Sequence, residues 1–139
     1  MRVLRNERVE ITRNGAVLDL AGIDDRTAAR SGVLGHGADL DAALAGRDAD
    51  RAVVLLAHQP VMVELAERRG VDLQISGHTH GGQLMPLGAV VLVDQPVISG
   101  LARVGGTWLY VTRGTGFWGP PVRVGAPPEI TLLTLRARR

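Results

Sequence analysis

Two short apolar runs on either side of a helix-length segment constrain the fold of this chain more than any other feature. The first run, RAVVLLAH (51–58), is almost continuously apolar, which is typical of a strand buried on both faces of a sheet. The second, VDLQISGH (71–78), alternates apolar and polar residues. Between them, Pro60 suits the first turn of a helix and Gly70 its end. The pattern predicts a β-α-β unit with parallel strands and a right-handed crossover, and therefore an α/β fold.

The flanking segments predict further strands around this unit. Asn14-Gly15 lies between two runs of alternating apolar residues, which indicates a hairpin. A short helix is expected at DLDAALAG (39–46), with Gly46 at its end. Later segments that read as strands are AVVLVDQPVISG (89–100), TWLYVT (107–112) and EITLLTL (129–135). No repeat or linker divides the sequence, so residues 1–139 are read as one domain.

The composition excludes several classes of function. The chain contains no cysteine, which removes disulfides, thiolate nucleophiles and cysteine-type zinc sites. No apolar run is long enough to cross a bilayer and the first ten residues do not read as a signal peptide, so the default expectation is a soluble, cytoplasmic protein. Residues 101–139 carry six arginines and a single carboxylate, Glu129. This cationic third either attracts an anionic substrate or is a solvated surface, and the sequence leaves both interpretations open.

Two of the four histidines end the strands of the β-α-β unit. His58 and His78 should meet at one sheet edge, because neighbouring parallel strands lie about 4.8 Å apart and open α/β sheets bind ligands at their carboxyl ends. His80 follows in a tight turn. The glycines that leave room for a ligand there are Gly77, Gly81 and Gly82. Three converging imidazoles predict a divalent metal site. The alternative is that they are loop histidines at strand ends.

Other polar residues read as structural. His36 lies in the loop VLGHGAD and has no partner at ligand spacing, so it is predicted to be an exposed loop residue. Asp24 and Asp25 follow a predicted strand, where carboxylates usually start a turn or cap a helix.

The motif SGHTHGGQ (76–83), with LLAHQP (55–60) upstream, resembles the calcineurin-like metallophosphoesterases. Residues 110–135 are similar to the C-terminal end of a bacterial branch of membrane-associated or exported phosphodiesterases, and residues 4–25 resemble the middle of the same domain. The resemblance implies an α/β fold, the C-terminal part of a two-sheet metallophosphoesterase sandwich, made of a β-α-β unit plus antiparallel strands. It also implies a metal-dependent phosphoesterase that hydrolyses phosphomonoesters, phosphodiesters or pyrophosphates by metal-bound hydroxide.

The resemblance assigns roles to individual residues. His58 and His78 match ligands of the second metal, and His80 matches a ligand of the first, in a site where two metals about 3.5–4 Å apart clamp a phosphoryl group. Arg113 and Arg123 are candidate contacts of the substrate phosphate, and surface salt bridging is the alternative for both. The metals expected at such a site are Mn, Fe or Zn.

Three signatures of that family, D-x-H, G-D-x-x-D and G-N-H, do not occur in this sequence. All three lie upstream in the family, so the chain is expected to be a C-terminal portion whose N-terminal half is absent. Because three imidazoles cannot balance the charge of two divalent cations, one metal or none is expected to bind. Exposed sheet edges and apolar faces are expected to favour association.

Two alternatives to an independent enzyme remain. One is a catalytically incompetent fragment, or one half of a split protein that needs an upstream partner, with a homo-oligomer as a further form. The other is a basic module for anions or nucleic acid, although no motif for specific nucleic-acid binding is present. Membrane contact is expected only through a parent protein, since full-length relatives in the resembled family are often anchored or exported.

Overall fold

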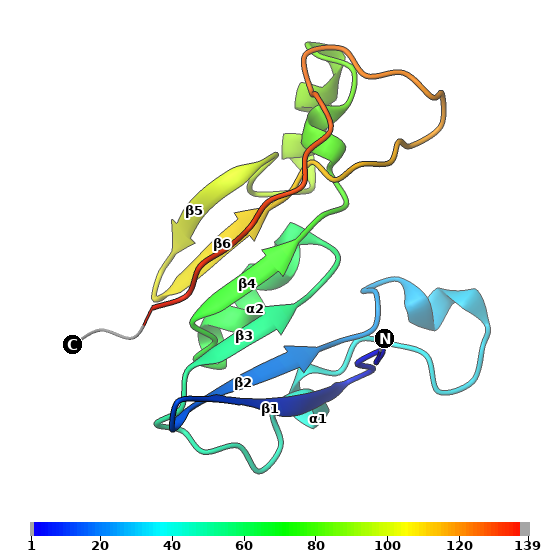
Figure 1. Ribbon diagram of the computed structural model, residues 1–139. Helices are drawn as coiled ribbons and strands as arrows, with labels where there is room; N and C mark the ends of the chain where they lie inside the picture. The colour runs from blue at the N-terminus through cyan, green and yellow to red at the C-terminus, as the bar shows by residue number, and fades with distance from the viewer. Residues whose placement is uncertain (1, 137–139) are drawn as a thin grey trace.

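A mixed six-stranded sheet forms the body of the computed structural model, which describes residues 2–136 (Figure 1). The strand order is β1-β2-β3-β4-β6-β5. The four central strands are parallel, and they are β2 (Ala16–Gly22), β3 (Val53–Leu56), β4 (Leu73–Ser76) and β6 (Thr107–Val111). The two edge strands, β1 (Glu7–Arg13) and β5 (Gly100–Val104), pair antiparallel with β2 and β6. The predicted α/β class is confirmed.

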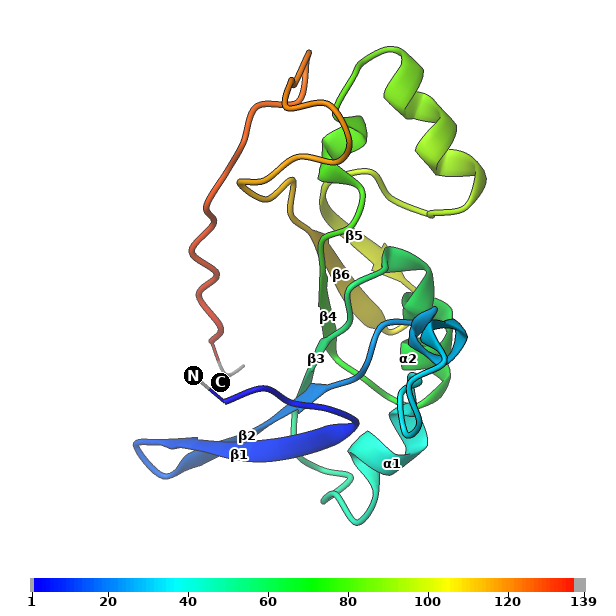
Figure 2. The ribbon, with the colours of Figure 1, turned by 90° about the vertical axis from the view of Figure 1, so that its right-hand side faces the viewer.

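The helices lie on one face of this sheet (Figure 2). The α-helices are α1 (Leu40–Leu44) and α2 (Val63–Arg68), and the 3₁₀ segments are η1 (Ala28–Ser31), η2 (Pro60–Met62), η3 (His80–Gly82) and η4 (Leu87–Val93). The largest core cluster joins this face of the sheet to the helices through Val53, Leu55 and Ala66, none of which is exposed. Valine, leucine and alanine fill the core, and the chain has few aromatic residues.

The local predictions for the first eighty residues hold. β3, η2, α2 and β4 form the β-α-β unit, with Leu55 opposite Gln74 in the parallel register. Asn14 and Gly15 turn the β1–β2 hairpin with φ of 51° and 78°. Helix α1 begins where the Asp39 carboxylate accepts a hydrogen bond from the Ala42 amide at 2.8 Å, and Gly46 follows it with φ of 66°.

The strand predicted at residues 89–100 is wrong. Residues 87–93 form η4 instead, and only Gly100 belongs to a strand. Strands β4 and β6 already have partners on both sides, so the outer edge of β5 is the open position nearest to this segment, and the segment does not pair with it. The backbone of this segment is satisfied locally, by bonds such as Gly88 N to Leu84 O at 2.8 Å.

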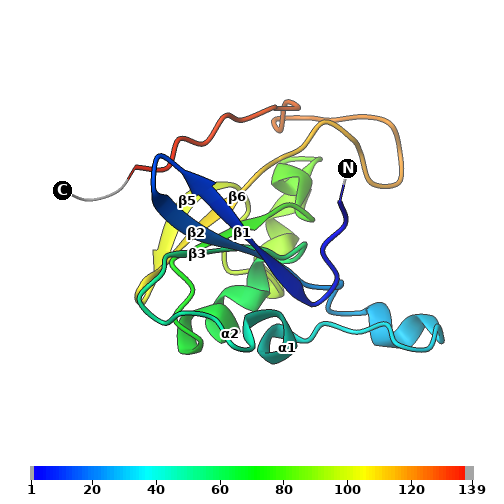
Figure 3. The same cartoon turned by 60° about the horizontal axis from the view of Figure 1, so that its bottom comes forward.

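Residues 129–135, predicted as a closing strand, join no strand ladder of the described structure. They run extended along the face opposite the helices (Figures 2 and 3). The Tyr110 hydroxyl holds them there by donating to Thr131 Oγ1 at 2.6 Å. Glu129 N donates to Gly114 O at 3.0 Å, and residues 130–136 make no backbone hydrogen bond to another described residue.

The face opposite the helices is apolar and largely uncovered. Alternation along each strand puts Val53 and Leu55 against the helices, so Leu56 points to this face. In the register of the paired strands, Ile11, Leu101 and Trp108 lie on the same face as Leu56. All four side chains are large, hydrophobic and exposed. None of the helices described for residues 2–136 combines the length and the apolar character that crossing a bilayer requires.

Candidate functional site

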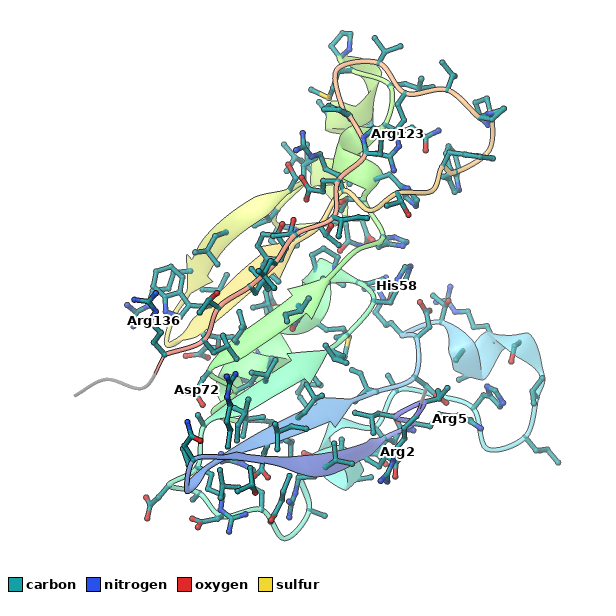
Figure 4. All side chains as sticks on the ribbon, in the orientation of Figure 1. Arg2, Arg5, His58, Asp72, Arg123 and Arg136 are labelled. Carbon is teal, nitrogen blue, oxygen red and sulfur yellow. The ribbon has the colours of Figure 1, made fainter. Side chains whose placement is uncertain are left out.

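His58 and His78 meet at the carboxyl end of the two strands of the β-α-β unit. His58 follows β3 after one residue, and Figure 4 shows its side chain at that end of the sheet. Nδ1 of His78 lies 3.3 Å from Nε2 of His58. The rings stand edge to face, with centroids 5.0 Å apart and an angle of 79° between their planes. Both side chains are exposed to solvent, so a ligand can reach them.

The turn that carries His78 and His80 has an unusual backbone. Both histidines have positive φ, 68° and 51°, which is uncommon for residues other than glycine and often marks a functional site. The turn is held from both sides: Gly77 N donates to His58 O at 3.1 Å, and the buried Thr79 hydroxyl donates to Ile98 O at 2.6 Å. These bonds fix the backbone that carries the histidines.

Two of the three predicted glycines have a clear reason to lack a side chain. Gly81 and Gly82 have φ of 66° and 78°. A Cβ on Gly81 would also lie 2.6 Å from Cγ of Arg113. Gly77 is less constrained, since its nearest neighbour would be Thr112 Cγ2 at 3.9 Å.

The electrostatic surroundings favour a neutral His78. Although His78 is exposed on one side, its partial burial lowers its pKa and the neighbouring His58 lowers it further, while Asp25 and Asp94 act in the opposite direction. The pKa of Asp25 is itself below its ordinary value. Burial raises it, but hydrogen bonds from Thr27 and the nearby His58 and His78 outweigh that effect. Asp25 starts a turn as the sequence predicted, since its Oδ1 accepts hydrogen bonds from Thr27 N at 2.7 Å and Thr27 Oγ1 at 2.6 Å. Its charge also acts on both His58 and His78.

His80 makes a different contact from its neighbour. Its Nδ1 lies 3.2 Å from Nη2 of Arg123, and a guanidinium group can only donate, so Nδ1 accepts this hydrogen bond. Sequence reasoning missed this pairing, because the two residues lie far apart in the chain. Among residues 2–136, no three His, Asp or Glu side chains lie together as a group able to hold a metal ion.

The histidine pair fits part of a metal site. Two nitrogens bound at about 2.0–2.1 Å to a tetrahedral metal would be about 3.3 Å apart. The His58 and His78 nitrogens are separated by 3.3 Å. Neutral imidazole is also the form that binds metal. These two residues therefore fit as ligands, and His80 in its present contact does not.

The two arginines proposed as phosphate contacts are engaged within the chain. Arg113 Nε donates to Glu129 Oε2 at 2.7 Å, and hydrogen bonds from Arg113 lower the pKa of Glu129. Arg123 donates to backbone carbonyls of three segments. These carbonyls belong to His80, Arg113, Gly114, Gly116 and Ala126. A phosphate contact by either arginine stays a prediction that would require these bonds to rearrange.

A cavity of about 580 Å³ opens beside the histidines. This volume is in the range of small-molecule sites. Histidines form one part of its wall and apolar side chains another. The lining residues are His58, His78, Thr79, His80, Gly82, Gln83, Leu84, Gly88, Val90, Val91 and Trp118.

No model of a known protein family matches this chain, and no solved structure matches it. Among curated proteins, a transmembrane protein with metallophosphoesterase domain from Bos taurus is 41% identical over 96% of this chain and 32% of its own length. An uncharacterized metallophosphoesterase of Campylobacter jejuni is 36% identical over 100% of this chain and 36% of its own length. An uncharacterized metallophosphoesterase of Aquifex aeolicus is 34% identical over 99% of this chain and 51% of its own length.

The chain thus spans about a third to a half of the length of the curated relatives it matches. Such partial coverage, together with the mixed six-stranded sheet, fits the C-terminal part of the domain. The similarity extends over nearly the whole of this chain in proteins from a mammal and from bacteria. The chain belongs to the metallophosphoesterase family.

Proposed function

We propose that this chain contributes to the site of a metal-dependent phosphoesterase, in which His58 and His78 hold a divalent metal ion. The observation that carries the proposal is the 3.3 Å separation of their ring nitrogens at the carboxyl ends of adjacent parallel strands. When bound, such a metal would polarise a phosphate oxygen and lower the pKa of water. The substrates would be phosphomonoesters, phosphodiesters or pyrophosphates.

The chain's own residues would hold and orient the reacting groups. Partial burial and the nearby His58 lower the pKa of His78, which favours the neutral form whose lone pair can bind a cation. Asp25, whose charge acts on both histidines, adds negative charge that favours a bound cation. His80 would join them only after exchanging its hydrogen bond with Arg123 for a metal contact.

We further propose that additional polypeptide completes the site. Two imidazoles do not balance a divalent cation, and residues 2–136 contain no third His, Asp or Glu grouped with them. The uncovered apolar face of the sheet is a suitable surface for such polypeptide, whether it is a further part of the domain or a second copy of the chain. The same observation favours the second candidate, a chain without hydrolytic activity of its own.

Metal titration tests the proposed ligands directly. Calorimetry with Zn²⁺ or Mn²⁺ is expected to detect about one site per chain, weakened at least tenfold by His58→Ala or His78→Ala. His36→Ala is the matched control, because His36 lies beside Asp24 and does not line the cavity that contains the pair. Equal affinity in all four proteins would contradict the proposed site.

A hydrolysis assay tests whether the chain is active alone. Hydrolysis of bis(p-nitrophenyl) phosphate by the wild type that is lost in both site variants would identify the chain as active alone. No hydrolysis by the wild type would favour the second candidate.

A further inference from the structure

Two uncharged segments lie side by side at the histidine cavity. Residues 84–93 (LMPLGAVVLV) and 114–122 (GTGFWGPPV) contain no Asp, Glu, Arg, Lys or His. Figures 1 and 2 show both segments at the same end of the molecule, beyond the carboxyl ends of β4 and β6. Val90, Val91 and Trp118 line the cavity that also contains His58 and His78.

Large apolar side chains of these segments face solvent. The exposed fractions are 72% for Val90, 54% for Leu92, 86% for Val93, 57% for Phe117 and 73% for Trp118. The chain has only two tryptophans, one tyrosine and one phenylalanine, so this surface carries two of its few aromatic residues. A contiguous exposed apolar patch on a folded protein usually marks a binding surface.

The position of Trp118 is fixed by a buried side chain. Gln83, which is 4% exposed, belongs to the same motif as the histidines. Its amide nitrogen donates to Trp118 O at 2.6 Å, and its amide oxygen accepts from Trp118 N at 2.6 Å. The histidine turn and the aromatic segment are therefore held as one unit, and the Trp118 backbone that carries the exposed indole is fixed at the cavity wall.

We propose that this surface binds the apolar part of an amphiphilic phosphate ester whose phosphate lies at His58 and His78. The placement of the phosphate rests on the proposed function, whereas the placement of the apolar part rests on the exposed surface alone. The cavity is continuous from the histidines to Trp118, and its volume of about 580 Å³ suits one small molecule. The two segments themselves carry no cationic residue, and the flanking Arg113 and Arg123 are engaged within the chain, which argues against an anionic membrane or nucleic acid as the occupant.

The test compares alkyl phosphates with tails of different length. The probes are butyl and octyl phosphate, kept at concentrations where both are monomeric. A Trp108→Phe background leaves Trp118 as the single tryptophan whose fluorescence reports binding. Each buried methylene strengthens binding about fourfold, so if half of the four extra methylenes are buried, octyl phosphate should bind at least tenfold more tightly.

Two variants test whether the preference for the longer tail depends on the apolar wall of the cavity. Val90→Asp should remove the preference for the longer tail. Leu101→Asp is the matched control, because Leu101 is 62% exposed on β5 and does not line the cavity, and this variant should keep the preference. Equal affinity for the two probes in the wild type would overturn the proposal. So would binding to neutral phosphatidylcholine vesicles without binding to monomeric octyl phosphate, because the occupant would then be a membrane surface.

A third comparison separates this inference from the proposed function. Octanol carries the tail without the phosphate, and it should also shift Trp118 fluorescence in a way that Val90→Asp abolishes. If octanol binds and His78→Ala leaves the affinity for octyl phosphate unchanged, the apolar site is supported and the placement of the phosphate is overturned. If octanol and octyl phosphate both fail to bind while His58 and His78 still bind metal, the apolar site is overturned and the proposed function stands.

Discussion

Arg123 joins the histidine turn to two other chain segments, through hydrogen bonds to the carbonyls of His80, Arg113 and Ala126. Arg123→Met is expected to reduce the free energy of unfolding by about 2 kcal/mol, because it leaves several of these carbonyls unpaired. Arg103→Met is the control, since Arg103 makes one hydrogen bond and stacks 5.3 Å above Trp108. Urea unfolding followed by circular dichroism measures both, and equal losses would contradict a structural role for Arg123.

A second residue-scale prediction concerns pH. Hydrogen bonds from Arg5, at 3.1 and 3.0 Å, and from the Gly37 amide lower the pKa of Asp24 from 3.8 to about 2. An unfolded chain binds more protons than the folded one between these values, so the contribution of Asp24 to stability is present above pH 3.8 and is lost as the pH falls through 2.

The measurement is the urea midpoint at several pH values. Asp24→Asn should be less stable than the wild type at pH 7, and the difference should shrink from pH 3.8 towards pH 2. Asp50→Asn is the control, because the Asp50 carboxylate makes no ion pair among residues 2–136. A difference between Asp24→Asn and wild type that does not change with pH would show that the carboxylate charge is not the cause.

The residues also show which site contacts a sequence can predict. The meeting of His58 with His78 follows from parallel strand geometry alone, because both residues come just after neighbouring strands. The contact of His80 with Arg123 depends on left-handed backbone at positions 78 and 80 and on the path of a distant loop. No periodicity or spacing in the sequence encodes that path.

At the scale of elements, η3 and η4 pack backbone to backbone. A Cβ on Gly88 would lie 1.8 Å from Gly82 O and 2.4 Å from Gly82 C. Since backbone atoms cannot move aside as a side chain can, Gly88→Ala should force the two segments apart and cost about 3 kcal/mol of stability. Trp118, on the same cavity, should report the separation as a change in fluorescence.

Gly106→Ala is the matched control. Gly106 lies in the turn between β5 and β6, and a Cβ there would meet nothing within 4 Å. Its melting temperature should stay close to that of the wild type, while that of Gly88→Ala falls by several degrees. A small effect of both substitutions would mean that η4 moves freely against η3.

The same packing explains why the strand at residues 89–100 was mispredicted. The run AVVLV has the composition of a strand, and local propensity favours one. The segment forms η4 instead, because Gly88 packs against Gly82 and because β6 already pairs with β4 and with β5. By contrast, the β-α-β unit and the Asn14-Gly15 hairpin were predictable because their turns and their hydrophobic periods agree with the tertiary structure.

At the scale of the molecule, the helices cover one face of the sheet and leave the other face open. Residues 130–136 lie along the open face, held by Tyr110 and without backbone partners among the described residues. The sequence predicts the apolar character of these strands, because alternation can be read from it. Which face stays uncovered follows only from the positions of α1 and α2 (Figures 2 and 3).

An uncovered apolar face should make the chain associate in solution. Sedimentation velocity over a hundredfold range of concentration is expected to detect dimers or larger species of the wild type, because burial of this face is favourable. Leu56→Lys introduces a charge at the middle of the face, where Leu56 is 39% exposed, and should shift the distribution towards monomer. Leu34→Lys changes a 98% exposed leucine in a loop away from the sheet and should not. A wild type that is monomeric throughout would contradict association through this face, and equal shifts in the two variants would mean that added charge alone prevents it.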